Sequence, residues 1–336
     1  MLSINVDPKI VRILENLYND TECAVVIDGQ LTAWFEVHVG LRQGCLLSPT
    51  LFNIFLEFVM KEVKDVENTL NLTDSLSLDI RYADDTTLLS AIFDKLSLTT
   101  KQLDDACRKW GMKINGAKCK VLSPENTPII LDGNEVEHVQ NFVFLGSSLP
   151  DTSGDVQRRI SLAATAFGRL RKNIWNCRNI SRNLKVRLFN ALILPIATYA
   201  SETWTLKQED IRLLQSFEMR GLRAILGVSL RDRKSNISIR ETLGIKYSIG
   251  DVIKNKRLKW FGHVVRRSDD SYVAKAYTQS FKNRRPPGRP PKRWSRQITD
   301  DLGIPLSTAE RTARNRTEWR KASWQERARA LNGLGT

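Results

Sequence analysis

Apolar residues recur at helical spacing in two early segments of the chain. In PKIVRILENLY (residues 8–18) they return every three or four positions, which predicts a helix with one apolar face. From Ser48 onward they form a second stripe, with Ser48 as the expected N-cap and Pro49 at the first helical position. The stripes consist of Ile10, Ile13, Leu14 and Leu17, and of Phe52, Phe55, Leu56 and Val59. We expect the second helix to be buried along its stripe.

Two other segments have the composition of β-hairpins. The first, ECAVVIDGQLTAWFEVHVG, carries the turn pair Asp28-Gly29 between β-rich stretches. The second, LSLDIRYADDTTLLSAIF, has strand composition on both sides of Asp84 and Asp85, which are therefore predicted to lie at or beside a hairpin tip. Adjacent carboxylates repel, and a fold keeps them where solvent, a base or a metal ion relieves the repulsion. A rigid turn would present both to Mg²⁺ as hard oxygen ligands; alternatively, Ala-Asp-Asp is only a polar turn.

Later segments have helical patterns with basic stripes. Residues from about 155 to 230 predict helices with apolar faces that pack together and basic faces that follow a nucleic-acid backbone. One positive face is expected to consist of Arg158, Arg159, Arg169, Arg171 and Lys172. The alternative is an ordinary charged helix surface.

A Pro-rich basic stretch, KNRRPPGRPPKRW (282–294), predicts an extended linker. Its centre resembles an AT-hook, in which Arg289 would enter a narrow minor groove. A basic spacer that touches phosphates non-specifically is the alternative.

The C-terminal segment predicts a further helix. Ser307 and Glu310 fit a capping box that opens a basic helix reaching about Ala330. Its two tryptophans, Trp319 and Trp324, are expected to pack on the body of the protein rather than to stack on bases.

Charge is strongly polarised along the 336 residues, whose net charge is +15. Residues 1–150 hold 13 Lys and Arg against 21 Asp and Glu, a net charge of −8, whereas the remainder holds 39 against 16, a net charge of +23. Such a division is expected when one part holds cations and the other binds a polyanion such as nucleic acid.

The cysteine pattern and the hydropathy of the chain indicate the cellular compartment of the protein. The five cysteines are scattered without any C-x-x-C pair, which favours a reducing compartment and argues against a disulfide framework or a zinc site. The first residues carry Asp7 and no long apolar run, so no secretory signal is predicted. The longest apolar segment contains Asn190 and Pro195 and indicates a core element. We expect an intracellular protein of nucleus or cytoplasm with no membrane association.

Four motifs occur in a characteristic order: LRQGCLLSPTLFNIFLE, RYADD, GMKINGAKCKVL and FVFLGSSL. Together they resemble the palm motifs of reverse transcriptases from non-LTR, LINE-type retrotransposons. The similarity continues more weakly through ALILPIATYASETWTL, RLLQSFEMRGLRAILGV and KRLKWFGHVVRR, which are similar to the thumb and post-thumb region of these elements.

The resemblance implies a role for each matching residue. Asp84 would be a ligand of catalytic Mg²⁺ or Mn²⁺ ions with Asp85 beside it, and Tyr82 would pack near the primer end. The nucleotide- and template-binding residues would be Arg42, Gln43, Gly44, Lys118 and Lys120, and the primer grip would be Phe144, Leu145 and Gly146. Without the family, Gln43 would cap a loop, and the lysines would be a solvated face.

One aspartate of the family has no counterpart here. It lies on a separate palm strand that precedes the helix at residues 8–18, and both Asp7 and Asp28 are explained by local structure, as a helix cap and a turn. By the same resemblance, we expect the fingers and the usual N-terminal endonuclease to be missing as well. We therefore expect the metal site of this polypeptide to be incomplete.

The sequence as a whole predicts an α+β fold: a partial right-hand polymerase palm of hairpins and helices, an α-helical thumb and a basic helical tail. The expected boundaries are 1–150 for the palm, 151–230 for the thumb, 231–281 for a basic post-thumb region, 282–303 for the linker and 304–336 for the C-terminal helix. The parent activity would be two-metal, RNA-directed DNA synthesis with an RNA template, a DNA primer and dNTPs, and this chain alone is expected to be inactive. The alternative is a non-catalytic nucleic-acid-binding remnant.

Overall fold

The computed structural model describes residues 1–69, 77–125, 127–131, 133–269, 271–278 and 292–322. The chain divides into two compact units, Met1–Gln140 and Asn141–Thr336. Small sheets alternate with helices in the first, and helices dominate the second, which confirms the predicted α+β class.

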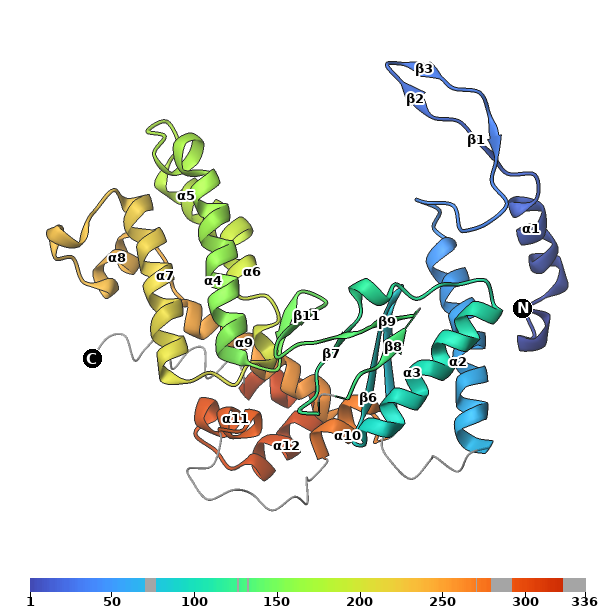
Figure 1. Ribbon diagram of the computed structural model, residues 1–336. Helices are drawn as coiled ribbons and strands as arrows, with labels where there is room; N and C mark the ends of the chain where they lie inside the picture. Colours follow the sequence, from blue (N-terminus) through green and yellow to red (C-terminus); the bar gives the residue numbers. More distant parts are fainter. Residues whose placement is uncertain (70–76, 126, 132, 270, 279–291, 323–336) are drawn as a thin grey trace. The chain divides into compact units, whose positions relative to one another are not determined.

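Among its described residues, unit 1 contains three α-helices and five strand pairs (Figure 1). The helices are α1 (Pro8–Tyr18), α2 (Ser48–Thr69) and α3 (Phe93–Lys109), with short 3-10 helices η1 (Leu2–Ile4) and η3 (Gly116–Lys118). The antiparallel pairs are β1 (Glu22–Cys23) with β4 (Phe35–Glu36), β2 (Val26–Ile27) with β3 (Gln30–Leu31), β5 (Ser77–Tyr82) with β6 (Asp85–Ser90), and β8 (Ile130–Leu131) with β9 (Asn134–Glu135). The parallel pair is β7 (Lys120–Val121) with β10 (Glu137–His138).

The core of unit 1 forms where α2 packs on α3. Its buried members are Leu56, Val59, Met60, Val63, Leu103, Ala106 and Cys107, and Phe52 and Phe55 pack against them. The predicted apolar stripe of the second helix is therefore confirmed. Ser48, however, is the first residue inside α2 rather than its cap, and its hydroxyl donates a hydrogen bond to the Arg42 carbonyl oxygen at 2.7 Å. It fastens the preceding loop to the helix.

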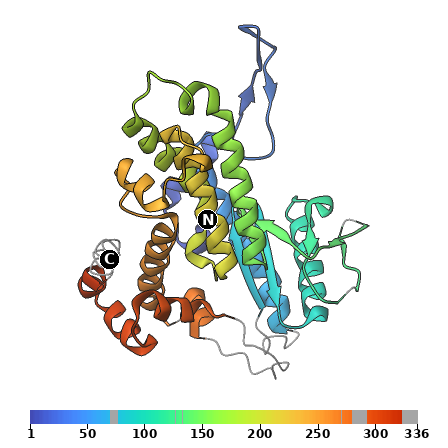
Figure 2. The same ribbon diagram turned by 90° about the vertical axis from the view of Figure 1, so that its left-hand side faces the viewer.

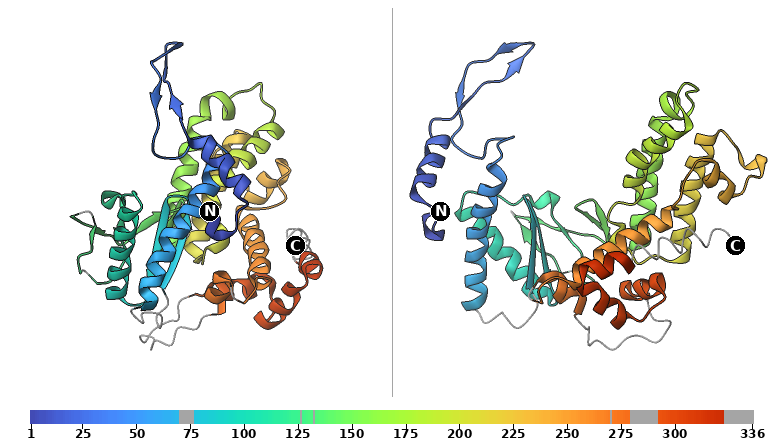
Figure 3. Two further views of the ribbon diagram at one scale, coloured as in Figure 1. Left: turned by 90° about the vertical axis from the view of Figure 1, so that its right-hand side faces the viewer. Right: turned by 180° about the vertical axis from the view of Figure 1, so that it is seen from behind.

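In the N-terminal part of unit 1 the predicted helix cap and turn are confirmed, but few side chains are buried. Asp7 caps α1 by accepting a hydrogen bond from the Lys9 backbone N–H at 2.8 Å, and Asp28 and Gly29 form the two-residue turn between β2 and β3 with φ of 50° and 81°. The arm built from β1 to β4 projects away from α1 and α2 (Figures 1 and 3). No residue of α1 is fully buried: Ile13 is 65% exposed, whereas Leu14 and Leu17 are half-buried, so the predicted helix covers its apolar face only in part.

Unit 2 begins with a hairpin and continues as helices (Figure 2). The hairpin strands are β11 (Phe142–Phe144) and β12 (Ser147–Leu149). The helices are α4 (Thr152–Arg169), η4 (Arg171–Trp175), α5 (Arg182–Leu188), η5 (Phe189–Ile193), α6 (Leu194–Ala197), η6 (Ser201–Thr203), α7 (Gln208–Leu226), η7 (Leu230–Asp232), α8 (Asn236–Thr242), α9 (Ile249–Val265), α10 (Tyr272–Thr278), α11 (Trp294–Leu302) and α12 (Leu306–Arg314). A further helical segment covers residues 316–322.

One large core in unit 2 extends from Val156 on α4 to Ile253 on α9. Phe189 and Leu222 are almost completely buried in it, and α4 lies beside α7 (Figure 2). A second core gathers Phe261, Ile298 and Trp319 from three later helical segments. Since the first core passes residue 230 without interruption, the expected thumb and post-thumb regions share one hydrophobic core.

The C-terminal segments differ from expectation in two ways. Helix α11 occupies residues predicted as linker, because Trp294 Nε1 donates to the Glu202 carbonyl at 2.8 Å and Gln297 Nε2 donates to the Leu206 carbonyl at 2.7 Å. The predicted capping box does not form: Pro305 is the N-cap of α12, which ends at Arg314. Trp319 is 4% exposed and donates to the Leu258 carbonyl, so its predicted packing is confirmed. Trp324 and Arg289 lie outside the described residues.

Candidate functional site

The two adjacent carboxylates lie at the tip of the hairpin β5–β6, as predicted. Tyr82 pairs with Asp85 in the strand register, which leaves Ala83 and Asp84 as the two turn residues. Ala83 has a φ of 53°, a left-handed conformation that is unfavourable for a residue with a Cβ atom. The fold therefore keeps a strained backbone beside Asp84, as is frequent at functional positions.

Charged side chains fasten this hairpin to α2 close to its tip. The Arg81 guanidinium lies 2.7 Å from the Glu57 carboxylate and 2.9 Å from that of Asp79. Asp79 in turn lies 3.4 Å from the Lys64 ammonium group. Leu88 of β6 packs against the core between α2 and α3. These contacts hold the hairpin on a rigid support although its tip is exposed.

The two faces of the hairpin have different environments. Because side chains alternate along a strand, Asp79 and Arg81 share the face directed at α2 while Ile80 and Tyr82 share the other. Asp85 stands directly opposite Tyr82 and belongs to that second face. Tyr82 is 66% exposed, and both carboxylates are exposed. The hairpin thus presents an aromatic ring and a carboxylate on its open face, next to Asp84 in the turn.

The carboxylate pair has the donor chemistry that Mg²⁺ prefers. This ion commonly binds one or two protein carboxylates and completes its octahedron with water and substrate phosphates. Across the residues that the structure describes, no group of three or more His, Cys, Asp or Glu side chains is placed to hold a metal ion. Asp84 and Asp85 are adjacent and exposed, and their carboxylate oxygens are of the kind that fits two of the ligand positions of such an ion.

The loop predicted to meet nucleotide and template lies directly before α2. Arg42 donates a hydrogen bond to the Thr21 hydroxyl at 3.1 Å, and its guanidinium carbon lies 5.9 Å from the centre of the Tyr18 ring. Gly44 has a φ of 81°, so glycine is required there by the turn itself. Arg42, Gln43 and Gly44 are exposed. In the described part of the chain, no hydrogen bond or ion pair joins this loop to the hairpin tip.

The two predicted phosphate-binding lysines have different environments. Lys118 is exposed at the end of η3. Lys120, on β7, forms an ion pair with Glu137, its neighbour on the parallel strand β10. The ammonium group of Lys120 thus has an acidic partner within unit 1, and its role as a phosphate ligand stays a prediction.

The predicted primer-grip residues belong to unit 2. Phe144 ends β11, and Leu145 and Gly146 form the two-residue turn to β12 with φ of 45° and 81°. Leu145 is 39% exposed. Its two carbonyl groups accept hydrogen bonds from Arg158 on α4 and from Tyr199, both within unit 2.

The five basic residues expected to form one positive face are divided between the two ends of α4. Arg169, Arg171 and Lys172 are exposed at its C-terminal end, about 16 Å along the helix from Arg158. Arg159 has a side chain only 9% exposed, and burial lowers its pKa. Because its guanidinium contacts the Gly146 carbonyl, Arg159 acts inside the protein rather than as an exposed phosphate ligand.

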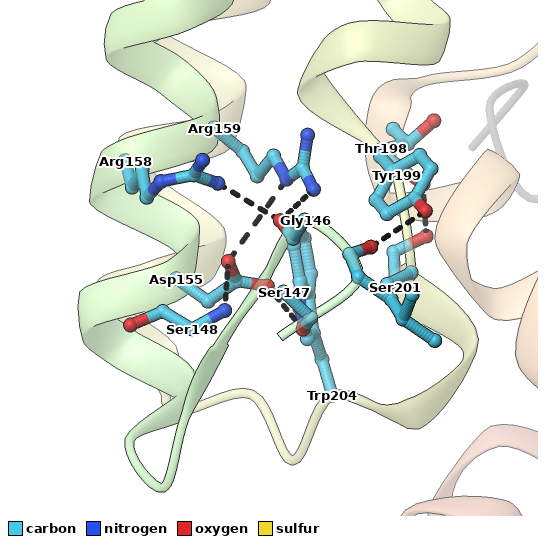
Figure 4. A network of polar contacts seen from close by, with 12 residues as sticks. Gly146, Ser147, Ser148, Asp155, Arg158, Arg159, Thr198, Tyr199, Ser201 and Trp204 are labelled. Atoms are coloured by element: carbon cyan, nitrogen blue, oxygen red, sulfur yellow. Dashed lines mark hydrogen bonds and ion pairs between the residues drawn. The ribbon is translucent and has the colours of Figure 1, made fainter. Parts of the chain in front are cut away.

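The sequence did not reveal several residues that shape these elements. Asp155, Tyr199 and Trp204 surround the Leu145–Gly146 turn, as Figure 4 shows. The i,i+4 spacing of Asp155 and Arg159 is a weak signal for a pair on α4. Nothing in the sequence links Tyr199 or Trp204 to a turn some fifty positions earlier.

No helix in the described ranges combines the length and the apolar character that a membrane span requires. Residues 1–149 match the model of the family described as reverse transcriptase (RNA-dependent DNA polymerase). This segment includes the 42–44 loop, the β5–β6 hairpin and the β11–β12 hairpin.

Several known proteins are similar over a longer part of the chain. An uncharacterised transposon-derived protein of Caenorhabditis elegans is 25% identical over 282 residues, which cover 75% of this chain and 95% of that protein. The RNA-directed DNA polymerase from mobile element jockey of Drosophila melanogaster is 23% identical over 321 residues, 88% of this chain and 33% of the polymerase. The Pol polyprotein from type-1 retrotransposable element R2 of Popillia japonica is 25% identical over 169 residues, 45% of this chain and 27% of that protein. The chain spans a third or less of the length of these two retrotransposon proteins.

Proposed function

We propose that this chain, whose residues 1–149 belong to the reverse transcriptase family and which is of retrotransposon origin, carries the metal-binding hairpin and the primer-strand elements of an RNA-directed DNA polymerase. The observation that supports this most is the β5–β6 hairpin. Its turn exposes Asp84, its open face presents Asp85 beside Tyr82, and Arg81 holds it to Glu57 of α2.

Asp84 and Asp85 would hold Mg²⁺ or Mn²⁺ through their carboxylate oxygens. When bound, such ions supply Lewis acidity for attack of a primer 3′-hydroxyl on the nucleotide. Tyr82 would support the sugar or base at the primer end through its exposed ring. Lys118 would neutralise phosphate charge, and the loop from Arg42 to Gly44 would meet the template and the incoming nucleotide.

Within unit 2, the Phe144–Gly146 turn would contact the primer strand, and the exposed Arg169, Arg171 and Lys172 would follow its backbone. Backbone phosphates require charge and reach, which exposed basic side chains at a helix end provide. In this view unit 1 corresponds to part of a polymerase palm, and the helices of unit 2 that follow the hairpin correspond to the thumb.

A second candidate function is nucleic-acid binding without catalysis. The net charge of +23 on residues 151–336 favours it, because such a segment binds polyanions whether or not a metal site works. This candidate requires only unit 2 and predicts that affinity for nucleic acid falls steeply with salt.

Primer extension by the purified 336-residue chain on a primed RNA template with Mg²⁺ or Mn²⁺ tests the proposal. Asp84→Asn is the test variant. Asp105→Asn is the matched control, since Asp105 is also exposed and adjacent to an aspartate, but on α3. Extension that is lost in Asp84→Asn and kept in Asp105→Asn supports catalysis. Template binding without extension in the wild-type chain supports the second candidate.

A further inference from the structure

The Leu145–Gly146 turn cannot be held by its own hairpin. Strands β11 and β12 have three residues each, and an isolated two-stranded hairpin of this size is at most marginally stable in water. Leu145 also occupies a left-handed conformation, with φ of 45°, that disfavours a residue with a side chain. Contacts from outside the hairpin must therefore fix this turn.

Asp155 of α4 supplies the first set of contacts (Figure 4). Its carboxylate is 1% exposed and accepts hydrogen bonds from the Ser148 backbone N–H at 2.9 Å, the Ser147 hydroxyl at 3.1 Å and Trp204 Nε1 at 2.9 Å. Hydrogen bonds to an ionised acceptor are about twice as strong as neutral ones. One buried carboxylate thus joins β12, the helix that follows it and the segment after η6.

The second set of contacts holds the two carbonyl groups of the turn itself. The Gly146 carbonyl accepts hydrogen bonds from both Arg158, at 2.9 Å, and Arg159, while the Leu145 carbonyl accepts one from the Tyr199 hydroxyl at 2.9 Å. The Arg159 guanidinium lies over the Tyr199 ring, 4.0 Å from its centre. A Cβ atom on Gly146 would lie 3.1 Å from the Arg159 side chain, so glycine is needed there for space as well as for its φ.

The network places buried charge beside the turn, next to the larger core of unit 2, to which Trp204 belongs. Arg159 Nε has no hydrogen-bond partner among the described residues, and it lies 3.9 Å from the Asp155 carboxylate. Burying a guanidinium with incomplete pairing costs free energy, and a hydrophobic contact would close a hairpin more favourably. What the network provides is one fixed backbone geometry at Leu145, which is exposed, and at Gly146, which is half-buried.

We propose that Asp155 and Tyr199 are positioning residues: they fix the Leu145–Gly146 backbone in the geometry in which it receives the recessed 3′ end of a primer strand. The proposal rests on the proposed function, since it takes this turn as a primer contact. It adds that the geometry of the contact is set by Asp155 on α4 and by Tyr199 after α6.

Tyr199→Phe is the sharpest test, because it removes one hydroxyl and keeps the ring under Arg159. Thr203→Val is the matched control: it removes a hydroxyl that donates to the Ala200 carbonyl in the same segment without contacting the turn. Two measurements on the full chain are needed. One is amide hydrogen exchange over residues 144–149, and the other is the affinity for a primed RNA template compared with a blunt duplex of equal length.

For Tyr199→Phe we expect about five- to tenfold faster exchange over residues 144–149, as for the loss of one hydrogen bond. The affinity of Tyr199→Phe for the primed template should fall several-fold. Its affinity for the blunt duplex and its melting temperature should equal those of the control Thr203→Val. Asp155→Asn should likewise lose more affinity for the primed template than for the blunt duplex. Faster exchange with unchanged discrimination between the two nucleic acids would show a purely structural role and overturn the proposal, as would unchanged exchange. Neither measurement depends on DNA synthesis, so a chain that fails to extend a primer still gives a clear result.

Discussion

Trp204 Nε1 lies 2.9 Å from a carboxylate oxygen of Asp155, forty-nine positions earlier in the chain, and both side chains are buried. This hydrogen bond connects the segment after η6 to α4 and, through Asp155, to the β11–β12 hairpin. It is a charge-assisted bond beside the larger core of unit 2, so its loss leaves a buried carboxylate oxygen with only the Ser147 hydroxyl as a donor.

Trp204→Phe is therefore expected to lower the free energy of unfolding more than an equivalent change at Trp319. Trp319 is equally buried, but it donates to a neutral acceptor, the Leu258 carbonyl, at 3.0 Å. The difference between the two variants should be roughly 1 kcal/mol, because hydrogen bonds to charged groups contribute more than those to neutral ones. Urea unfolding followed by circular dichroism measures both. Equal losses of unfolding free energy in the two variants would show that the charge of Asp155 does not strengthen its hydrogen bond with the Trp204 indole.

The buried Glu218 predicts a specific pH dependence of stability. Burial raises its pKa, although Arg240 at 2.6 Å and the Ile249 backbone N–H at 2.9 Å oppose the shift; the neighbouring Asp251 reinforces it. A folded-state pKa above the unfolded value of about 4.3 means that the folded chain binds more protons. The contribution of Glu218 to the free energy of unfolding is therefore fully present below its pKa in the unfolded chain. It is lost as pH rises through its pKa in the folded chain.

Glu218→Gln removes this titration. The free energy of unfolding of the wild-type chain minus that of the variant should therefore grow as pH falls from about 7 to about 4.5. Denaturant titrations at several pH values measure the difference, with Glu209→Gln as a control on an exposed position of the same helix. A difference that shrinks toward acid pH would contradict the assignment.

Two glycines in helices of unit 2 should respond oppositely to substitution by alanine. At Gly168 in α4 an added Cβ atom meets nothing within 4 Å, so Gly168→Ala should stabilise the protein by about 0.5–1 kcal/mol through helix propensity. At Gly221 in α7 the Cβ atom would lie 2.7 Å from the buried Phe189 ring, and Gly221→Ala should destabilise by about 1–3 kcal/mol through overpacking. Melting temperatures that shift in the same direction would refute the packing of α7 on η5.

The cysteines of unit 1 should differ widely in reactivity. Hydrogen bonding from the Leu47 backbone N–H, together with Ser48 and Arg42, lowers the pKa of Cys45. Burial raises the pKa of Cys107 to about 11. At pH 8 only about one Cys107 in a thousand is then a thiolate, the reactive form. Iodoacetamide labelling with peptide mass spectrometry should find Cys45 modified at least a hundredfold faster.

The same thiol reports on the proposed nucleotide- and template-binding loop, since Cys45 follows Gly44 directly. A primed RNA template that binds the loop should slow the alkylation of Cys45 and leave that of Cys23, exposed on β1, unchanged. Equal labelling rates with and without the template would count against the assignment of Arg42 to Gly44.

The sequence predicted correctly those turns and hairpins whose conformation depends on neighbouring residues. Asp28-Gly29 specifies its turn through two positive φ angles, and the run from Arg81 to Ser90 specifies a hairpin with the carboxylates at its tip. These features depend on neighbouring residues in the sequence, so they can be deduced without a fold.

Features that depend on distant partners could not be deduced. Lys120 forms an ion pair with Glu137, seventeen residues later, and Arg159 is buried against a turn and a tyrosine. Helix α11 forms within a predicted linker because Trp294 and Gln297 find backbone carbonyl partners ninety positions earlier. In each case the sequence contained the right residue type, but the tertiary contact determined its role.

The claim that Asp84 and Asp85 hold a divalent cation is tested most directly by Mn²⁺ titration, followed by electron paramagnetic resonance, of the full chain bound to a primed RNA template. If the two carboxylates hold the ion, Asp84→Asn weakens the affinity for Mn²⁺ at least tenfold. The control Asp105→Asn, with the same loss of charge in unit 1, leaves that affinity unchanged. Mn²⁺ binding that is equally strong in the wild-type chain and in Asp84→Asn would contradict this claim.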